Sequence, residues 1–176
     1  MHDAAWIASV VERFEGPLVR YAARLAGDLE RGRDVVQETF FRLTTAPREH
    51  VEPRLAEWLY TVCRNGALSV RRKEGRMAVL DTKTLSARES ETTSPSKRLE
   101  ASEGKGRLRA VVENLSERQR EVVRLRFQDG LSYKEIAGVL ELSVSNVGVI
   151  LHEALKKLRV ELGAGPSLST TERSAS

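Results

Sequence analysis

The strongest constraint on the fold is a run of helix start and stop signals between Leu115 and Leu162. Ser116-x-x-Gln119 and Ser132-x-x-Glu135 are capping boxes, in which a serine and a polar side chain three residues later satisfy the amides of a helix start. Asp129-Gly130 ends the first of these helices, and the three-residue turn Glu141-Leu142-Ser143 ends the second with a new start signal. The spacing therefore predicts a short helix, a tight turn and a longer helix, which is a helix-turn-helix.

The longer helix is expected to have one buried and one exposed face. Val147, Leu151, Ala154 and Leu158 share one side at helical spacing and should face the core. A DNA major groove admits one helix, and the second helix of such a motif presents its first outward turns to base edges. Asn146 could pair with adenine through both groups of its amide. An ordinary helical hairpin without DNA is the alternative.

The DNA-facing candidates of this motif share exposed positions on the longer helix, at the helix starts or on the preceding helix, where bases or phosphates would pass. They are Arg124, Arg126, Ser132, Tyr133, Lys134, Ser143, Ser145, Asn146, Val149, His152 and Lys156.

Catalysis and metal binding are not expected for this chain. Cys63 is the only cysteine, and His2, His50 and His152 are scattered, so no disulfide, metal constellation or nucleophile with its base is visible. We therefore expect no enzyme activity, no metal and no cofactor. The start of the chain has no signal-peptide pattern and no segment is apolar enough for a membrane span, so a cytoplasmic location is expected. The net charge of +4 permits nucleic-acid binding without demanding it.

The amino-terminal half is predicted to begin with three helices. The first covers Ala4 to Phe14, Gly16-Pro17 breaks it, and a second runs from Pro17 to about Gly27. After a polar loop containing Gly32, Asp34 caps or starts a third helix, in which Val36, Phe40 and Leu43 face inward. An exposed row on that helix comprises Asp34, Gln37, Glu38 and Phe41. On pattern alone, such an acidic row is usually no more than a solvated face.

A polar loop from Arg48 to Arg54, bounded by Pro47 and containing Pro53, precedes a helix predicted from Leu55 to Lys73. That helix is expected to bury Trp58, Leu59, Val62, Ala67 and Val70 and to turn Arg64, Asn65, Arg71, Arg72 and Lys73 outward. The basic flank beside Trp58 and Tyr60 could hold single-stranded nucleic acid by phosphate contacts and stacking. The alternative is that both aromatic residues belong to the core.

The predicted fold class is all-α, with two small helical domains joined by a flexible linker. The boundaries are 1–73 for the first domain, 74–104 for the linker, 105–162 for the second domain and 163–176 for a disordered tail. Within the linker, a helical patch over Met77 to Leu85 is possible, and Leu99 to Asn114 should form the first helix of the second domain. A linker this polar should leave the two domains free to move relative to each other.

Four sequence runs carry a family resemblance. Leu115 to Phe127 and Leu131 to Ala137 resemble both the DNA-binding domain of LuxR-type regulators and the last domain of bacterial sigma factors. Asp34 to Leu43 (DVVQETFFRL) and Trp58 to Leu68 (WLYTVCRNGAL) resemble the second conserved region of extracytoplasmic-function (ECF) sigma factors of the sigma-70 family. LuxR-type regulators have no such amino-terminal half, which favours the sigma factors.

The resemblance implies partners: core RNA polymerase, contacted at its clamp coiled coil and flap, promoter DNA and an anti-sigma factor, with a monomeric free protein. It places Asp34, Gln37, Glu38 and Phe41 on polymerase and the helix-turn-helix candidates on the minus-thirty-five element. Residues implied at the opened minus-ten element are Arg48, Glu49, His50, Arg54, Trp58, Tyr60, Arg64, Asn65, Arg71 and Arg72.

The recognition helix departs from the family pattern. The usual Gly-Thr-Val-Lys-Ser-Arg-Leu is replaced by a run from Ser145 to Leu151 without a cation, Glu153 lies on the same side, and Glu141 replaces a common glycine. This departure keeps two alternatives open. One is a sigma-like decoy that binds an anti-sigma factor, and the other is a conventional duplex-binding regulator.

Overall fold

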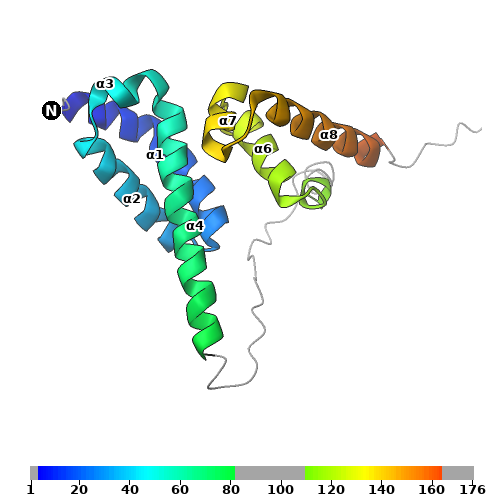
Figure 1. The fold of residues 1–176 in the computed structure, drawn as a ribbon, viewed down its shortest axis with the longest axis horizontal. Helices are drawn as coiled ribbons and strands as arrows, with labels where there is room; N and C mark the ends of the chain where they lie inside the picture. The colour runs from blue at the N-terminus through cyan, green and yellow to red at the C-terminus, as the bar shows by residue number, and fades with distance from the viewer. Residues whose placement is uncertain (1–3, 82–109, 164–176) are drawn as a thin grey trace, which may run out of the picture.

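The computed structural model describes residues 4–81 and 110–163, and these form two helical units (Figure 1). The first unit contains α1 (Ala4–Ala26), α2 (Leu29–Thr45), α3 (Arg48–Val51), the 3-10 helix η1 (Glu52–Arg54) and α4 (Leu55–Asp81). The second contains a helical turn at 110–113, α6 (Glu117–Phe127), α7 (Tyr133–Leu140) and α8 (Val144–Gly163). In the described residues every regular element is a helix, which confirms the predicted all-α class.

Helix α1 is continuous, so the predicted break at Gly16-Pro17 is wrong. Pro17 lies inside the helix, where its missing N–H removes one backbone hydrogen bond. Phe14 before the proline and Leu18 and Tyr21 after it are buried. They lie on one stripe of α1, the helix that packs against α2 and α4. Burial of each large apolar side chain contributes about 1.5–3 kcal/mol, so the stripe together outweighs a proline cost of about 3 kcal/mol.

Helix α2 begins earlier than predicted, because Asp28 rather than Asp34 is its cap. The Asp28 carboxylate accepts a hydrogen bond from the Arg31 amide at 3.0 Å. Gly32, which was expected in a loop, lies within the helix, and a Cβ there would stand 2.7 Å from the Ala23 backbone nitrogen. The glycine therefore marks where α1 and α2 cross closely, and not a turn.

The segment from Arg48 to Arg54 is also more regular than the predicted loop, since it folds into α3 and η1. Helix α4 continues past Lys73 to Asp81, so the first residues assigned to the linker are helical. The remainder of the predicted linker (82–104), the first residues of the predicted second domain (105–109) and the predicted tail from residue 164 lie outside the described residues; Gly163, the first residue of that tail, ends α8.

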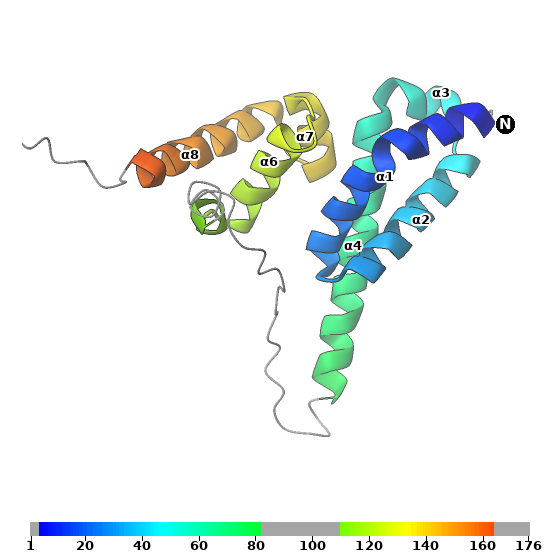
Figure 2. The same ribbon diagram turned by 180° about the vertical axis from the view of Figure 1, so that it is seen from behind.

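The helix-turn-helix has the predicted form. Both capping boxes are present, and the turn between α7 and α8 places Glu141 in the left-handed region at φ 55°. Val147, Leu151, Ala154 and Leu158 of α8 are all buried, as their spacing predicted. Figure 2 shows α8 running on from α7 after a short turn.

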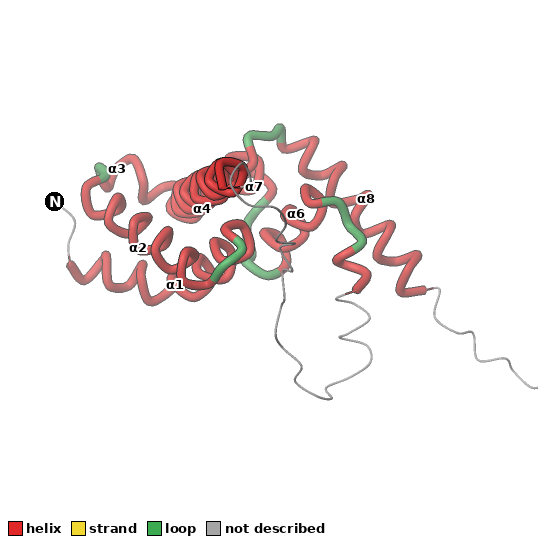
Figure 3. Tube along the Cα trace, turned by 90° about the horizontal axis from the view of Figure 1, so that it is seen from below, coloured by secondary structure: helices red, strands yellow, loops and turns green. Residues whose placement is uncertain are grey.

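The two units lie against each other in this structure. Seen from below, α7 lies beside α4 while α2 and α3 lie on the opposite side of the first unit (Figure 3). A Cβ at Gly138 of α7 would stand 2.4 Å from a side-chain carbon of Glu57 on α4, so the helices approach closely. The polar linker was expected to leave the domains independent; the structure shows a contact between them that the sequence did not indicate.

Candidate nucleic-acid interface

The outer face of α8 matches its prediction. Ser145, Asn146, Val149, His152 and Lys156 are all exposed, on the side away from the buried stripe. Val149 is 56% exposed, which is high for an apolar side chain. The face can therefore contact a groove, but Lys156 is its one cation among these five residues.

The start of α8 assigns a different role to Ser143. Its hydroxyl oxygen accepts a hydrogen bond from the Asn146 amide at 3.1 Å, so the side chain caps α8. The Ser132 side chain is similarly engaged at the start of α7, where it donates to Glu135 at 2.7 Å. Tyr133 and Lys134 are exposed beside it. The two serines thus shape the helix starts, and the neighbouring exposed groups are the ones available to DNA.

The two arginines predicted on α6 are held by the protein itself. Arg126 donates to the Leu131 carbonyl at 3.0 Å, and its guanidinium lies 5.6 Å from the Tyr133 ring centroid. Arg124 is half-buried and lines a small pocket with Tyr21 and Arg24 of the first unit. Arg124 therefore faces the other domain in this structure, and not the side on which α8 is exposed.

Most side chains of the basic flank of α4 are exposed, as predicted. Asn65, Arg71 and Arg72 are exposed and, with Leu68, line an open hollow of about 450 Å³. Arg64 differs from them, because its side chain is only 19% exposed and is engaged by the second unit.

The stacking role predicted for Tyr60 is wrong in this structure. Tyr60 is 1% exposed, and its ring lies 5.2 Å from the Tyr21 ring, centroid to centroid. Burial, with the charge and hydrogen bond of Asp129, raises the pKa of Tyr60 above its usual value of 10.0. Trp58 is half-buried and packs against the core. An apolar helical stripe gives both aromatics a core role, which was the alternative weighed from the sequence.

The α3 segment is exposed but locally constrained. Arg48 donates two hydrogen bonds to the Glu52 carboxylate, at 2.8 and 2.9 Å, and its guanidinium lies 4.8 Å from the Trp6 ring centroid. Arg54 donates to the His50 carbonyl at a long 3.4 Å. Glu49 and His50 are exposed on the same turn.

An acidic and apolar face stands on α2. Asp34, Gln37, Glu38 and Phe41 are all exposed, as predicted, while Val36 and Leu43 point into the core. Phe41 is 65% exposed. Glu38 is bonded by Arg42 one turn later at 2.8 Å, so the face contains both charges.

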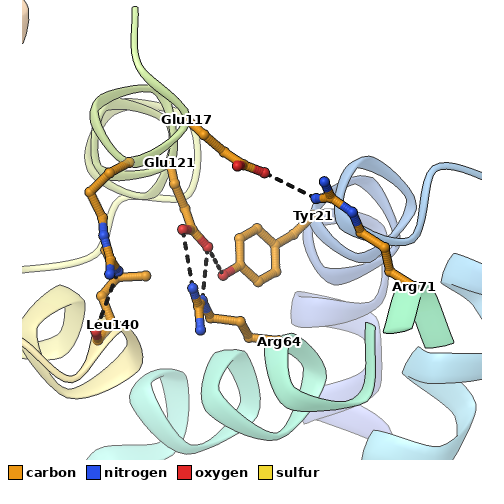
Figure 4. Close-up of polar contacts among 7 residues, drawn as sticks. Tyr21, Arg64, Arg71, Glu117, Glu121 and Leu140 are labelled. Atoms are coloured by element: carbon orange, nitrogen blue, oxygen red, sulfur yellow. Dashed lines mark hydrogen bonds and ion pairs between the residues drawn. The ribbon is translucent and has the colours of Figure 1, made fainter. Parts of the chain in front are cut away.

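Sequence reasoning missed a polar junction between the two units (Figure 4). Glu121 of α6 accepts a hydrogen bond from the Tyr21 hydroxyl at 2.8 Å and from the Arg64 Nε at 3.0 Å. Glu117 of α6 accepts one from Arg71 at 3.0 Å. The paired residues are far apart in the sequence. Each one is also consistent with the helical pattern of its own segment, so no short-range signal indicates the pairing.

The junction perturbs the groups that form it. Burial, and then Glu121, raise the pKa of Tyr21 above its usual value. Burial acts to lower the pKa of Arg64, but its hydrogen bonds to Glu121 and the carboxylate charge outweigh burial and raise it. Burial also raises the pKa of Asp129, against the opposing effects of Tyr60, Arg24 and Arg20.

Residues 4–81 and 110–163 hold no cluster of three His, Cys, Asp or Glu side chains suited to a metal. No single helix in them is long and apolar enough to cross a membrane; α7 and α8 pass that test only as a pair, bent by 102°. Eight of their apolar residues are buried in the core of the helix-turn-helix: Ile136, Ala137, Val139, Leu140, Val147, Leu151, Ala154 and Leu158.

Comparison with known proteins gives matches over both units. The family described as Sigma-70 region 2 matches residues 10–77, and the family described as Sigma-70, region 4 matches residues 105–158. The chain is 30% identical to the ECF RNA polymerase sigma factor SigD of Mycobacterium bovis, over 92% of this chain and 79% of that protein. It is 29% identical to SigL of Mycobacterium tuberculosis, over 91% and 90% of the two chains.

One solved structure has a similar fold. It is the sigma factor RpoE of Bartonella quintana, determined with the anti-sigma factor NepR. The TM-score is 0.61 at 21% identity, covering 93% of this chain and 100% of that one. At this identity the likeness supports the arrangement of helices and no more.

Proposed function

The chain belongs to the ECF sigma factors of the sigma-70 family, and from that premise we propose how its two units share the work of initiating transcription. Region 2, here α1 to α4, binds core RNA polymerase and holds the opened minus-ten strand. Region 4, here α6 to α8, contacts the minus-thirty-five duplex. The observation that carries this proposal is the exposed face on α2, which region 2 does not need for its own core.

The α2 face has the composition of a protein-binding surface. Phe41 is 65% exposed beside Asp34, Gln37 and Glu38, so an apolar anchor stands among charged and amide groups. Interfaces gain most from a few aromatic or arginine anchors surrounded by polar groups. A basic partner helix with an apolar contact point would complement this face, and the clamp coiled coil of polymerase is the partner we propose.

The α4 flank supports strand binding. Asn65, Arg71 and Arg72 line an open hollow. The guanidinium groups of Arg71 and Arg72 can contact successive phosphates of a strand. Trp58 and Tyr60 act by shaping the core beneath this flank, since Tyr60 is buried and Trp58 packs against the core. The strand is therefore held by phosphate contacts, with the exposed α3 residues Glu49 and His50 positioned to contact an extruded base.

Region 4 supports sequence reading with little electrostatic help. On α8, Asn146 and His152 can donate or accept at base edges, while Val149 can contact a thymine methyl group. Lys156 is the one cation in the outward row of α8, so this row should contribute only a weak dependence on salt, because salt dependence reflects the phosphates neutralised.

Two other functions were open from the sequence. A LuxR-type regulator is excluded, because the region 2 match covers residues 10–77. A sigma-like decoy is the second candidate, and the single cation in the outward row of α8 favours it. For both the sigma factor and the decoy, we propose an anti-sigma factor as a further partner, because the structurally similar RpoE was determined in complex with one. The decoy would not direct transcription.

Polymerase binding can be tested by reversing charges on the α2 face. Asp34→Arg with Glu38→Arg should abolish co-purification with core polymerase and leave helix content unchanged, because exposed charges contribute about 0–1 kcal/mol to the fold. The matched control is Glu12→Arg with Glu153→Arg, which makes the same charge change at exposed positions on α1 and α8. Binding of the α2 variant at wild-type levels would refute this assignment.

A further inference from the structure

The junction between regions 2 and 4 brings opposite charges together. Region 4 contributes an acidic edge, which we define as Glu117 and Glu121 of α6 and Asp129 just beyond it. Region 2 presents arginine and tyrosine donors: Arg71 to Glu117, and Arg64 with Tyr21 to Glu121 (Figure 4). Hydrogen bonds between specific donors of region 2 and carboxylates of region 4 therefore join the two regions.

Glu121 is the centre of this contact. Its side chain is 11% exposed and that of Arg64 is 19% exposed, so water screens the pair poorly. Both hydrogen-bond donors recorded for the Glu121 carboxylate, Tyr21 and Arg64, come from region 2. The nearly buried Glu121 carboxylate therefore depends on region 2 for these hydrogen bonds.

Glu141 adds an independent observation. It holds a left-handed backbone at φ 55°, a conformation that favours glycine and costs a residue with a Cβ some strain. Its negative charge acts on Arg64 and contributes to that residue's raised pKa. A strained acidic residue thus adds a weaker electrostatic influence on the same arginine that Glu121 binds.

The arginines held in this way are those proposed to bind DNA. Arg64 and Arg71 belong to the basic flank of α4, where the opened strand would pass. The N–H groups that donate to Glu117 and Glu121, Nη1 of Arg71 and Nε and Nη2 of Arg64, are not available to a phosphate while region 4 is docked. Docking of region 4 and binding of a strand therefore compete for the same donors.

We propose that the acidic edge of region 4 is an intramolecular competitor of promoter DNA, which occupies Arg64 and Arg71 in the free chain and must leave before region 2 can hold a strand. This inference rests on the proposed strand-binding role of α4. The α2 face stays exposed in the closed arrangement, because α2 lies on the side of region 2 away from region 4 (Figures 1 and 3). Polymerase can therefore engage the closed chain first, and separation of the regions follows.

The test compares two charge-matched double variants of the full chain. Glu117→Gln with Glu121→Gln removes two charges of the acidic edge and keeps the side-chain size. Glu12→Gln with Glu15→Gln removes two charges from exposed positions on α1, outside the junction and outside the helices proposed to contact DNA. Binding of a fluorescent mixed-sequence DNA single strand of about 20 nucleotides, longer than a typical single-strand site, is measured without polymerase. Small-angle X-ray scattering gives the radius of gyration of each protein.

The acidic-edge variant should bind the strand about tenfold more tightly than the control, if the closed form is in about tenfold excess, and its radius of gyration should rise. Equal affinity of the two variants, an unchanged radius, or no strand binding by the acidic-edge variant would each overturn the proposal. Should that double variant fail to fold, Glu117→Gln alone carries the test with a smaller gain, since the Glu117 side chain is 77% exposed. Because polymerase is absent, these outcomes are independent of whether the α2 face binds it.

Discussion

Replacement of Glu141 by glycine should stabilise region 4. The residue is in the left-handed region at φ 55° between α7 and α8, held there by the hydrogen bond from the Leu142 amide to the Ala137 carbonyl at 2.9 Å. A left-handed backbone costs a residue with a Cβ about 1–2 kcal/mol. Glycine avoids this strain, but its greater conformational freedom in the unfolded chain lowers the stability of the fold by about 0.4–1 kcal/mol. Relief of the backbone strain alone therefore gives Glu141→Gly a net gain of about 0.5–1 kcal/mol.

The charge of Glu141 requires its own control. A negative charge at the carboxyl end of α7 opposes the helix dipole at a cost of about 0.3–1 kcal/mol, and Glu141→Gln removes that charge while keeping the strained backbone. We therefore expect a small gain for Glu141→Gln and a larger one for Glu141→Gly. In urea, the far-UV circular dichroism transition reports both regions, while the fluorescence of Trp6 and Trp58 reports region 2. Equal stabilities for the two variants, or a loss of stability in Glu141→Gly, would refute the strain argument.

Three further predictions concern single residues. Gly32→Ala should lower the unfolding free energy by about 1–3 kcal/mol, as overpacking does, because its Cβ would stand 2.7 Å from the Ala23 nitrogen, whereas Gly75→Ala, with nothing within 4 Å, should not; equal effects in urea melts would contradict this. The thiol of Cys63 should resist alkylation at pH 8 until the chain unfolds, since burial raises its pKa to about 12; rapid labelling of native protein would show the packing to be wrong. Asn146→Ala should weaken binding to the preferred upstream sequence by about 1–3 kcal/mol and to a scrambled one much less, as salt-titrated duplex binding would measure; an equal loss on both would move base reading to another residue.

Local patterns were sufficient for the second unit. Both capping boxes, the turn at Glu141 and the buried stripe from Val147 to Leu158 depend on residues close in the sequence. The same is true of the exposed face on α2, where Phe41 and its neighbours follow the helical period. Short-range hydrogen bonds and periodic burial determine these features, so a sequence pattern predicts them well.

Tertiary packing decided the features that the sequence predicted wrongly. Pro17 does not break α1 because the apolar residues around it are buried against two other helices. Gly32 was predicted to lie in a loop. It lies in α2, where the missing Cβ lets the backbone of α1 approach closely. Arg64 read as an outward cation because Glu121, which binds it, lies 57 residues away in the sequence. No local signal contains these long-range partners.

The most direct test of the account is transcription of the genome that encodes this chain, using core polymerase with and without the protein. The account predicts new, discrete start sites that share sequence elements near minus ten and minus thirty-five, and their loss with the Asp34→Arg, Glu38→Arg variant. Start sites identical to those of core polymerase alone, from a protein that still binds polymerase, would contradict the account and leave the decoy as the better description.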